Sequence, residues 1–221
     1  MLHQESEKGK VLIATNGEGT FMILATVSFF IFILATTVFA DGFVAHWPQD
    51  GDSNDIIGGH NPSATNAVSF VNGKIGQGVT LGTGGYIDIP DAPDLQNQQF
   101  TVSVWVRPDG PGPNVNTDEF GDCIVQKGLL APAGHFSASE SLCWSATNQR
   151  FRFTVGNYGT NVIATTNIFP PGQFYHVVGT YNGLQLKLYV NGTLEAQKAL
   201  QMTIPYDAAV PWTIGSTYSY L

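Results

Sequence analysis

The chain has 221 residues, of which 25 are glycine and 12 are proline, and only 12% are charged. Its net charge of −8 excludes the basic stripe with which proteins commonly bind nucleic acids. No segment after residue 40 has helical periodicity over ten or more residues, so the composition favours one all-β domain rich in turns.

The first 40 residues divide into two parts. Residues 1–20 form a polar segment of mixed charge, and residues 21–40 form an apolar run without charge. A run of this length can span a bilayer as a helix. It can also belong to a signal peptide, because Val38-Phe39-Ala40 resembles a small-x-small cleavage site. We therefore predict a hydrophobic helix at 21–40 that is either a signal peptide or a membrane anchor. Both place residues 41–221 outside the cytoplasm, secreted or at the cell surface.

An acidic loop follows the first expected strand, residues 43–47. The loop carries Asp50, Asp52, Asn54 and Asp55 among glycines. Calcium prefers several hard oxygen ligands on a flexible loop, so Asp52 and Asp55 are predicted metal ligands and Ca²⁺ is the predicted cofactor. The EF-hand pattern does not apply, because its twelfth position, counted from Asp50, is Asn61 and not Glu. The alternative is a solvated loop without metal, since Asp, Asn and Gly dominate ordinary turns.

Further strands are expected at residues 67–71, 74–81, 86–90 and 100–107. The last of these has the clearest alternation of apolar and polar residues. Its valines, Val102, Val104 and Val106, should face the core, which leaves Trp105 and Arg107 on the opposite face.

Two cysteines, Cys123 and Cys143, lie on strands expected to form a hairpin. In an oxidising compartment they should form a disulfide, which would stabilise the fold by roughly 3 kcal/mol. Two buried free thiols are the alternative for a cytosolic protein. Two cysteines do not suffice for a tetrahedral zinc site.

Residues 174–200 show the strongest strand signal in the chain. Apolar residues alternate with polar ones, and two Asn-Gly pairs, Asn182-Gly183 and Asn191-Gly192, interrupt the pattern. Asn-Gly accepts positive φ at both central positions of a type I′ turn. The pattern predicts three antiparallel strands joined by two tight turns.

Several segments resemble motifs of one family. They are Gly73-Lys-Ile-Gly-Gln-Gly-Val-Thr-Leu, Tyr86-Ile-Asp-Ile-Pro-Asp-Ala-Pro-Asp-Leu, Phe100-Thr-Val-Ser-Val-Trp-Val-Arg-Pro-Asp, Gln173-Phe-Tyr-His-Val-Val-Gly-Thr-Tyr-Asn-Gly and Leu186-Lys-Leu-Tyr-Val-Asn-Gly-Thr-Leu. In this order, over residues 43–216, they resemble a laminin-G-like (concanavalin A-like lectin/glucanase) jelly-roll domain. The resemblance implies an all-β sandwich of two antiparallel sheets over residues 41–221. Relatives usually continue with one more strand that pairs with the first, so we expect the domain to lack its last strand and the chain to be part of a longer protein.

The outward face of the central strands offers a candidate binding surface. If the strand registers are as predicted, Trp105, Arg107, Arg152 and Tyr189 point away from the core and form the candidate ligand-binding set. Sugars stack on aromatic rings, and charged side chains bind their hydroxyls. The alternative is that Trp105 and Tyr189 lie under the loops at 108–120 and 128–140.

Nothing in the sequence predicts catalysis. Laminarinase-type glycosidases on this fold carry a Glu-x-Asp-x-x-Glu strand, whereas the carboxylates clustered here, at 118–122, lie in an expected loop, and Glu140 and Glu195 stand alone. His176 belongs to the family motif and is expected to pack rather than react. We predict no catalytic residue and a non-enzymatic module that recognises carbohydrate or a surface glycoprotein. The alternatives are a structural spacer or adhesion domain and an accessory domain of a hydrolase.

Overall fold

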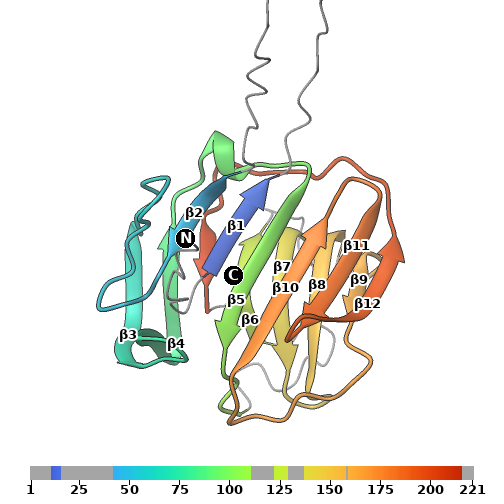
Figure 1. The fold of residues 1–221 in the computed structure, drawn as a ribbon. Helices are drawn as coiled ribbons and strands as arrows, with labels where there is room; N and C mark the ends of the chain where they lie inside the picture. The colour runs from blue at the N-terminus through green and yellow to red at the C-terminus, as the bar shows by residue number, and fades with distance from the viewer. Residues whose placement is uncertain (1–10, 16–41, 111–121, 129–136, 158, 216–221) are drawn as a thin grey trace, which may run out of the picture.

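The computed structural model describes residues 11–15, 42–110, 122–128, 137–157 and 159–215. These form a sandwich of two antiparallel sheets (Figure 1), which confirms the predicted all-β class. The hydrophobic helix predicted at 21–40 lies outside the described residues. Within them, the helical structure is one short 3₁₀ turn, η1 (Pro93–Leu95), and no helix has the length and apolar composition needed to cross a membrane.

The first sheet has six strands. Their order across the sheet is β12 (Thr193–Ala199), β11 (Gln185–Val190), β10 (Tyr175–Tyr181), β5 (Phe100–Val106), β1 (Val11–Thr15) and β2 (Phe43–Trp47). The three strands predicted within 174–200 are therefore confirmed as β10, β11 and β12, each paired with the next.

The second sheet has seven strands and packs behind the first in Figure 1. Their order is β3 (Ala64–Asn72), β4 (Gln77–Ile89), β13 (Trp212–Ile214), β6 (Asp122–Gly128), β7 (Ser137–Ser145), β8 (Arg150–Asn157) and β9 (Val162–Ala164). Two strands predicted separately, at 74–81 and 86–90, join into the long β4. The short strand β13 lies between β4 and β6, which are not paired with each other.

The core lies between the sheets and follows the alternation of the strands. On β5, Phe100, Val102 and Val104 are at most 5% exposed, as the pattern of residues 100–107 predicts. Opposite them, β8 contributes Phe153, whose ring lies 6.0 Å from that of Phe100. Gly179 of β10 faces Phe153, and a Cβ at this glycine would approach the ring to 2.6 Å, so the close packing of the two sheets requires glycine there.

The two Asn-Gly turns differ in conformation. At Asn191-Gly192 both residues have positive φ, 50° and 80°, as the predicted type I′ turn requires. At the first turn, positive φ occurs only at Gly183, and the Asn182 side chain accepts hydrogen bonds from the N–H groups of Leu184 and Gln185, at 3.1 and 2.8 Å. The first turn is therefore an Asx-type turn stabilised by its side chain, not a type I′ turn.

Two further sequence predictions concern the N-terminal residues and the cysteines. Residues 1–20 are predicted as a polar segment outside the domain, yet Val11–Thr15 form β1, between β2 and β5. Strand β2 is the edge strand of its sheet and pairs with β1. Cys123 and Cys143 lie opposite each other on β6 and β7, and the predicted disulfide is confirmed.

Candidate functional site

The four predicted ligand-binding residues do not share one face. Three of them are on the six-stranded sheet: Trp105 on β5, Arg107 directly after β5, and Tyr189 on β11. All three alternate with core residues of these strands. Arg152 lies on β8, in the seven-stranded sheet. The prediction of a common surface is therefore wrong for Arg152, because alternation indicates which side of a strand faces the core but not which of two sheets the strand joins.

The outer face of the six-stranded sheet carries a half-buried aromatic cluster around Trp105. His176, directly opposite on β10, stacks on Trp105 with ring centroids 5.1 Å apart and 25° between planes. The Nε2 atom of His176 lies 2.8 Å from the Oγ atom of Ser103. Lys74 places its Nζ atom 5.3 Å from the centre of the Trp105 ring. We call these four residues, with Arg107 and Phe174, the Trp105 surface.

Arg107 extends the Trp105 surface beyond the end of β5. Its guanidinium lies 5.3 Å from the ring centre of Phe174. The Asp109 carboxylate accepts two hydrogen bonds from it, at 2.7 Å from Nε and 3.2 Å from Nη2. This carboxylate raises the pKa of Arg107, which keeps the positive charge fixed. At the end of β5, the Phe174 ring and the Arg107 guanidinium, fixed by Asp109, thus lie together on an exposed part of the sheet.

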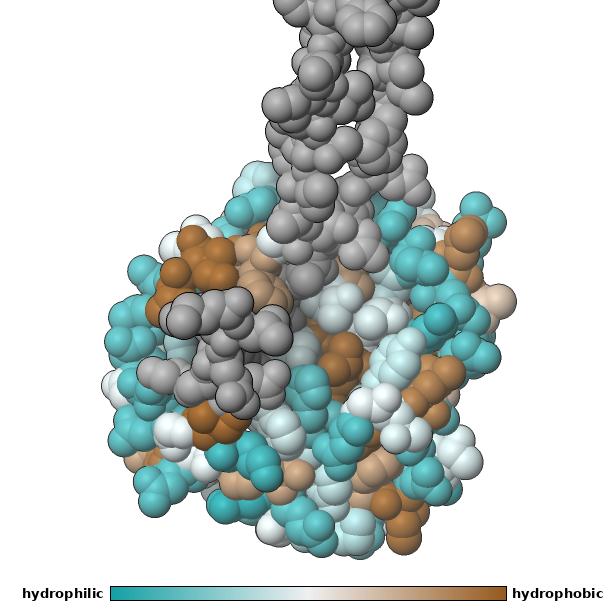
Figure 2. Space-filling model, in the orientation of Figure 1, coloured by the Kyte–Doolittle hydropathy of each residue, from teal (hydrophilic) through white to brown (hydrophobic). Residues whose placement is uncertain are grey.

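Tyr189 lies two strands away from β5 on the same face. It is half-buried and pairs with Val178, which in turn pairs with Ser103. From the usual strand spacing and rise, the Cα atoms of Tyr189 and Trp105 are about 12 Å apart. Figure 2 shows polar and apolar side chains interspersed over this face. The two aromatic residues thus stand apart by about the length of a short oligosaccharide.

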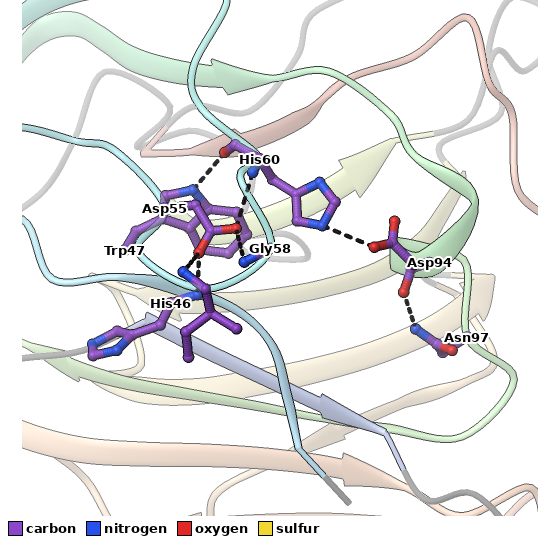
Figure 3. Close-up of polar contacts among 8 residues, drawn as sticks. His46, Trp47, Asp55, Gly58, His60, Asp94 and Asn97 are labelled. Atoms are coloured by element: carbon purple, nitrogen blue, oxygen red, sulfur yellow. Dashed lines mark hydrogen bonds and ion pairs between the residues drawn. The ribbon is translucent and has the colours of Figure 1, made fainter.

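The acidic loop after β2 is organised by Asp55 (Figure 3), whose side chain is buried. Its Oδ1 atom accepts hydrogen bonds from the N–H groups of His46 and Ile57, at 2.8 and 2.9 Å. Its Oδ2 atom accepts from Gly58 and His60, both at 3.0 Å. Burial acts to raise the pKa of Asp55, but these amides and the His60 charge outweigh burial and lower it.

The loop held by Asp55 covers the outer edge of β2. The N–H of Ile56 donates to the carbonyl of His46 at 3.0 Å, and Trp47 donates from Nε1 to the carbonyl of His60 at 2.8 Å. His60 reaches on to η1, where its Nε2 atom lies 3.2 Å from the Asp94 carboxylate. The loop therefore occupies the edge at which β2 could otherwise pair with another chain.

This arrangement fits calcium poorly at the predicted ligands. Each carboxylate oxygen of Asp55 already accepts two N–H groups, and Asp52 accepts the N–H of Asn54 at 2.9 Å. Among the described residues, no group of three or more His, Cys, Asp or Glu side chains could hold a metal ion. Calcium ligation by Asp52 and Asp55 stays a prediction.

A polar row crosses the outer face of the seven-stranded sheet. The row consists of five residues, each paired with the next one on the neighbouring strand: Asp88, Thr213, Gln126, Ser141 and Thr154. All are at most 8% exposed, although each alternates with core residues of its own strand. Thr213 donates from Oγ1 to Asp88 at 2.9 Å, and burial raises the pKa of Asp88. The hydroxyl of Ser141 has no hydrogen-bond partner among the described residues.

Arg152 adjoins this row rather than the Trp105 surface. It lies opposite Cys143 and two residues before Thr154 on β8, so the two side chains are on the same face of the strand. Sequence reasoning missed the row, although its signal was present: one polar residue stands between apolar residues in Ile87-Asp88-Ile89, Trp212-Thr213-Ile214 and Phe153-Thr154-Val155. Only the sheet order brings these residues side by side.

A charged cluster lies on the core side of the same sheet. Lys127 is fully buried, and its Nζ atom is 2.5 Å from the Asp91 carboxylate and 2.9 Å from the carbonyl of Asp207. Beside it on β7, Glu140 is 2% exposed and lies 3.0 Å from the hydroxyl of Tyr206. Glu140 is therefore not alone, as the sequence suggested, but it faces the interior of the sandwich and so is no candidate for catalysis.

The hydrogen bonds of Tyr206 indicate that Glu140 is protonated. The Tyr206 hydroxyl has one proton, which it donates to the carbonyl of Asn97 at 2.6 Å. A protonated Glu140 can then donate to the same hydroxyl oxygen. Burial raises the pKa of Glu140 well above its ordinary value, and this outweighs the opposing effects of Tyr206 and the Lys127 charge, while Asp91 raises it further.

Glu140→Gln should therefore stabilise the protein at neutral pH. A carboxyl with a raised folded-state pKa contributes stability fully below its unfolded pKa and loses it as the pH rises towards the folded value. An amide keeps the donor without that loss. In thermal melts from pH 4 to 8, the variant should melt above the unmodified protein at pH 7 and level with it near pH 4. The control is Glu195→Gln, at a half-buried carboxylate that accepts hydrogen bonds from Asn167, and this variant should not gain stability at pH 7. A Glu140→Gln variant that melts lower at every pH would contradict a protonated Glu140.

The comparisons with known proteins agree with this fold. The Laminin_G_3 family model, described as the concanavalin A-like lectin/glucanases superfamily, matches residues 81–220. A comparison with curated proteins finds no match.

Among solved structures, the chain is similar to domain 4 of AbnA, a GH43 extracellular arabinanase from Geobacillus stearothermophilus, in complex with arabinotriose. The identity is 20% and the TM-score 0.61, with 80% of this chain and 84% of that chain covered. It is also similar to the binding domain of Paraclostridial Mosquitocidal Protein 1, with 15% identity, a TM-score of 0.53, and 73% and 41% covered. A third similar structure, botulinum neurotoxin type C, has 13% identity, a TM-score of 0.50, and 94% and 42% covered. At these identities the similarity shows the fold.

Proposed function

Because this chain belongs to the concanavalin A-like lectin/glucanases superfamily, we propose that it is a non-catalytic carbohydrate-recognition module that acts outside the cytoplasm. Its partners would be a polysaccharide or the glycans of a surface glycoprotein. The disulfide between Cys123 and Cys143 supports an oxidising, extracellular location.

The observation that carries this proposal is the Trp105 surface. Trp105 is half-buried on a face that does not contribute to the core, and it is flanked by an imidazole and a lysine. The C–H face of a sugar ring stacks on such aromatic residues, while charged and imidazole nitrogens bind its hydroxyls. Tyr189, about 12 Å away on the same face, would provide a second contact for a longer ligand.

Two of the similar structures point in the same direction. The arabinanase domain was solved with arabinotriose, and botulinum neurotoxin type C is described as entering cells through interaction with two ganglioside molecules. Both ligands are carbohydrate or carry it. The alternative, an accessory domain of a hydrolase, is favoured by the arabinanase domain, which is one part of an enzyme.

Trp105→Ala should weaken glycan binding by about tenfold or more, because it removes the stacking surface. The measurement is a glycan array followed by titration calorimetry on the full chain, with calcium and with chelator. Trp105→Phe keeps a ring and should retain most of the affinity.

Arg152→Ala is the matched control on the opposite sheet and should bind as the unmodified protein does. If Arg152→Ala loses binding and Trp105→Ala does not, the polar row is the binding site and our assignment of the surface is wrong. If the folded chain binds no glycan in either condition, the carbohydrate proposal fails and the spacer alternative takes its place. Loss of binding with chelator alone would support the calcium prediction.

A further inference from the structure

Strand β1 fills a gap between two strands that do not pair with each other. It is antiparallel to both neighbours, and Ile13 lies opposite Ala45 of β2 and Val102 of β5. In the order of the sheet, β1 is the only described link between β2 and the other four strands (Figure 1). Without it, two rows of backbone N–H and C=O groups would face each other across a gap one strand wide.

The position of β1 conflicts with both predicted roles of residues 21–40. If this apolar run crossed a bilayer once, residues 11–15 and β2 would lie on opposite sides of the membrane and could not pair. If the chain were cleaved after Ala40, β1 would leave with the removed segment. In one molecule, β1 therefore cannot pair in the sheet while residues 21–40 act as a membrane anchor or as a cleaved signal peptide.

We propose that the gap between β2 and β5 is a strand-addition site, with β1 as its exchangeable occupant. Its ligand is an extended peptide segment that runs antiparallel to both strands and completes their backbone hydrogen bonds. When residues 1–40 are removed or held across a membrane, the site becomes available to such a segment from another chain.

The neighbours of β1 define the sequence that the site accepts. Positions 11 and 13 lie opposite four core residues of the adjacent strands: Trp47, Ala45, Val104 and Val102. The intervening position 12 lies opposite Ser103, which contacts His176 of the Trp105 surface. The site should therefore select apolar residues at the positions of Val11 and Ile13, and the segment that occupies it borders the Trp105 surface.

The test uses the full chain with Ile13→Pro, because proline cannot donate to the ladder and should displace β1. The probe is a fluorescent peptide of residues 8–17, Lys-Gly-Lys-Val-Leu-Ile-Ala-Thr-Asn-Gly. Fluorescence anisotropy should show it binding the variant at least tenfold more tightly than the unmodified chain. The same peptide with proline at position 13 is the control and should bind neither protein. Equal binding of both peptides, or binding of neither by a folded variant, would overturn the proposal.

A second measurement covers the case in which Ile13→Pro does not fold. In the unmodified chain, hydrogen–deuterium exchange should be much faster in residues 11–15 than in β10 and β11, because an exchangeable strand opens locally. Excess peptide should then slow exchange in β2 and β5, and the proline peptide should not. If hydrogen exchange in residues 11–15 is as slow as in β10, and added peptide does not change it, β1 is not an exchangeable strand and the proposal fails.

Discussion

Asp55→Ala should lower the free energy of unfolding by about 3 to 5 kcal/mol, because it leaves four backbone N–H groups, one on β2 and three in the loop after it, without their acceptor. Hydrogen bonds to a charged group contribute about 1.5 to 3 kcal/mol each, and part of this loss is recovered where the freed groups reach water. The loop also covers the edge of β2, so the variant should expose that edge and aggregate more readily. Urea unfolding measured by tryptophan fluorescence gives the stability, and light scattering gives the aggregation.

The pH dependence of this effect separates Asp55 from an ordinary packing residue. The pKa of Asp55 is lowered in the folded state, so its stabilisation is present above its ordinary value and is lost as the pH falls through the folded value. The penalty of Asp55→Ala should therefore shrink below about pH 4. Asp52→Ala, in the same loop, removes an acceptor that holds one backbone N–H group, that of Asn54; this variant is the matched control and should cost less than about 1 kcal/mol. A penalty that stays constant down to pH 2 would show that the carboxylate charge is not what holds the loop.

Lys127→Met should destabilise the protein by about 3 to 5 kcal/mol, because it leaves the buried Asp91 carboxylate without its cation. The ion pair has an N–O distance of 2.5 Å, and its side chains are 0% and 6% exposed. The variant also removes the donor to the carbonyls of Asp207 and Val210, which lie in the segment before β13. Methionine keeps the length and volume of the lysine stem, so the loss reports the charge and its hydrogen bonds rather than a cavity.

The double variant Lys127→Met/Asp91→Asn tests this reason directly. Removal of both charges should recover part of the lost stability, because an unpaired buried charge costs more than a neutral pair. Chemical unfolding of the two single variants and the double variant completes the cycle. If the double variant is less stable than Lys127→Met by the full cost of Asp91→Asn, the two side chains do not interact and the cluster is not an ion pair.

Strand alternation made the local parts of the fold predictable. The core face of β5 and the order of β10 to β12 follow from residues adjacent in sequence, such as Leu186, Leu188 and Val190. Arg152 was misplaced because alternation indicates which side of β8 faces the core but not which of the two sheets β8 joins. Residues 11–15 were too short a run, within a polar segment, to be recognised as a strand.

The buried ionisable side chains could not be predicted for a related reason. A lysine or glutamate on a strand is ordinarily read as exposed, because burial of a charge is costly without a partner. The partner of Glu140 is Tyr206, 66 residues away, and the carbonyl partner of Lys127 is 80 residues away. The composition of the Asp55 loop likewise does not show that its carboxylate accepts four backbone N–H groups. Calcium binding by this loop stays a prediction.

The position of β13 governs when the protein can finish folding during its synthesis. The β3–β4 hairpin and the run from β6 to β9 are complete before Trp212–Ile214 is made, yet these three residues are what join them in one sheet. Until residue 214 leaves the ribosome, β4 and β6 each wait with an unpaired edge, and the core lacks the buried ring of Trp212. At typical synthesis rates of about 5 to 20 residues per second, β6 would wait for several seconds after its own synthesis. Nascent chains whose emerged part ends before residue 212 should therefore depend on chaperones far more than chains that have emerged beyond residue 215.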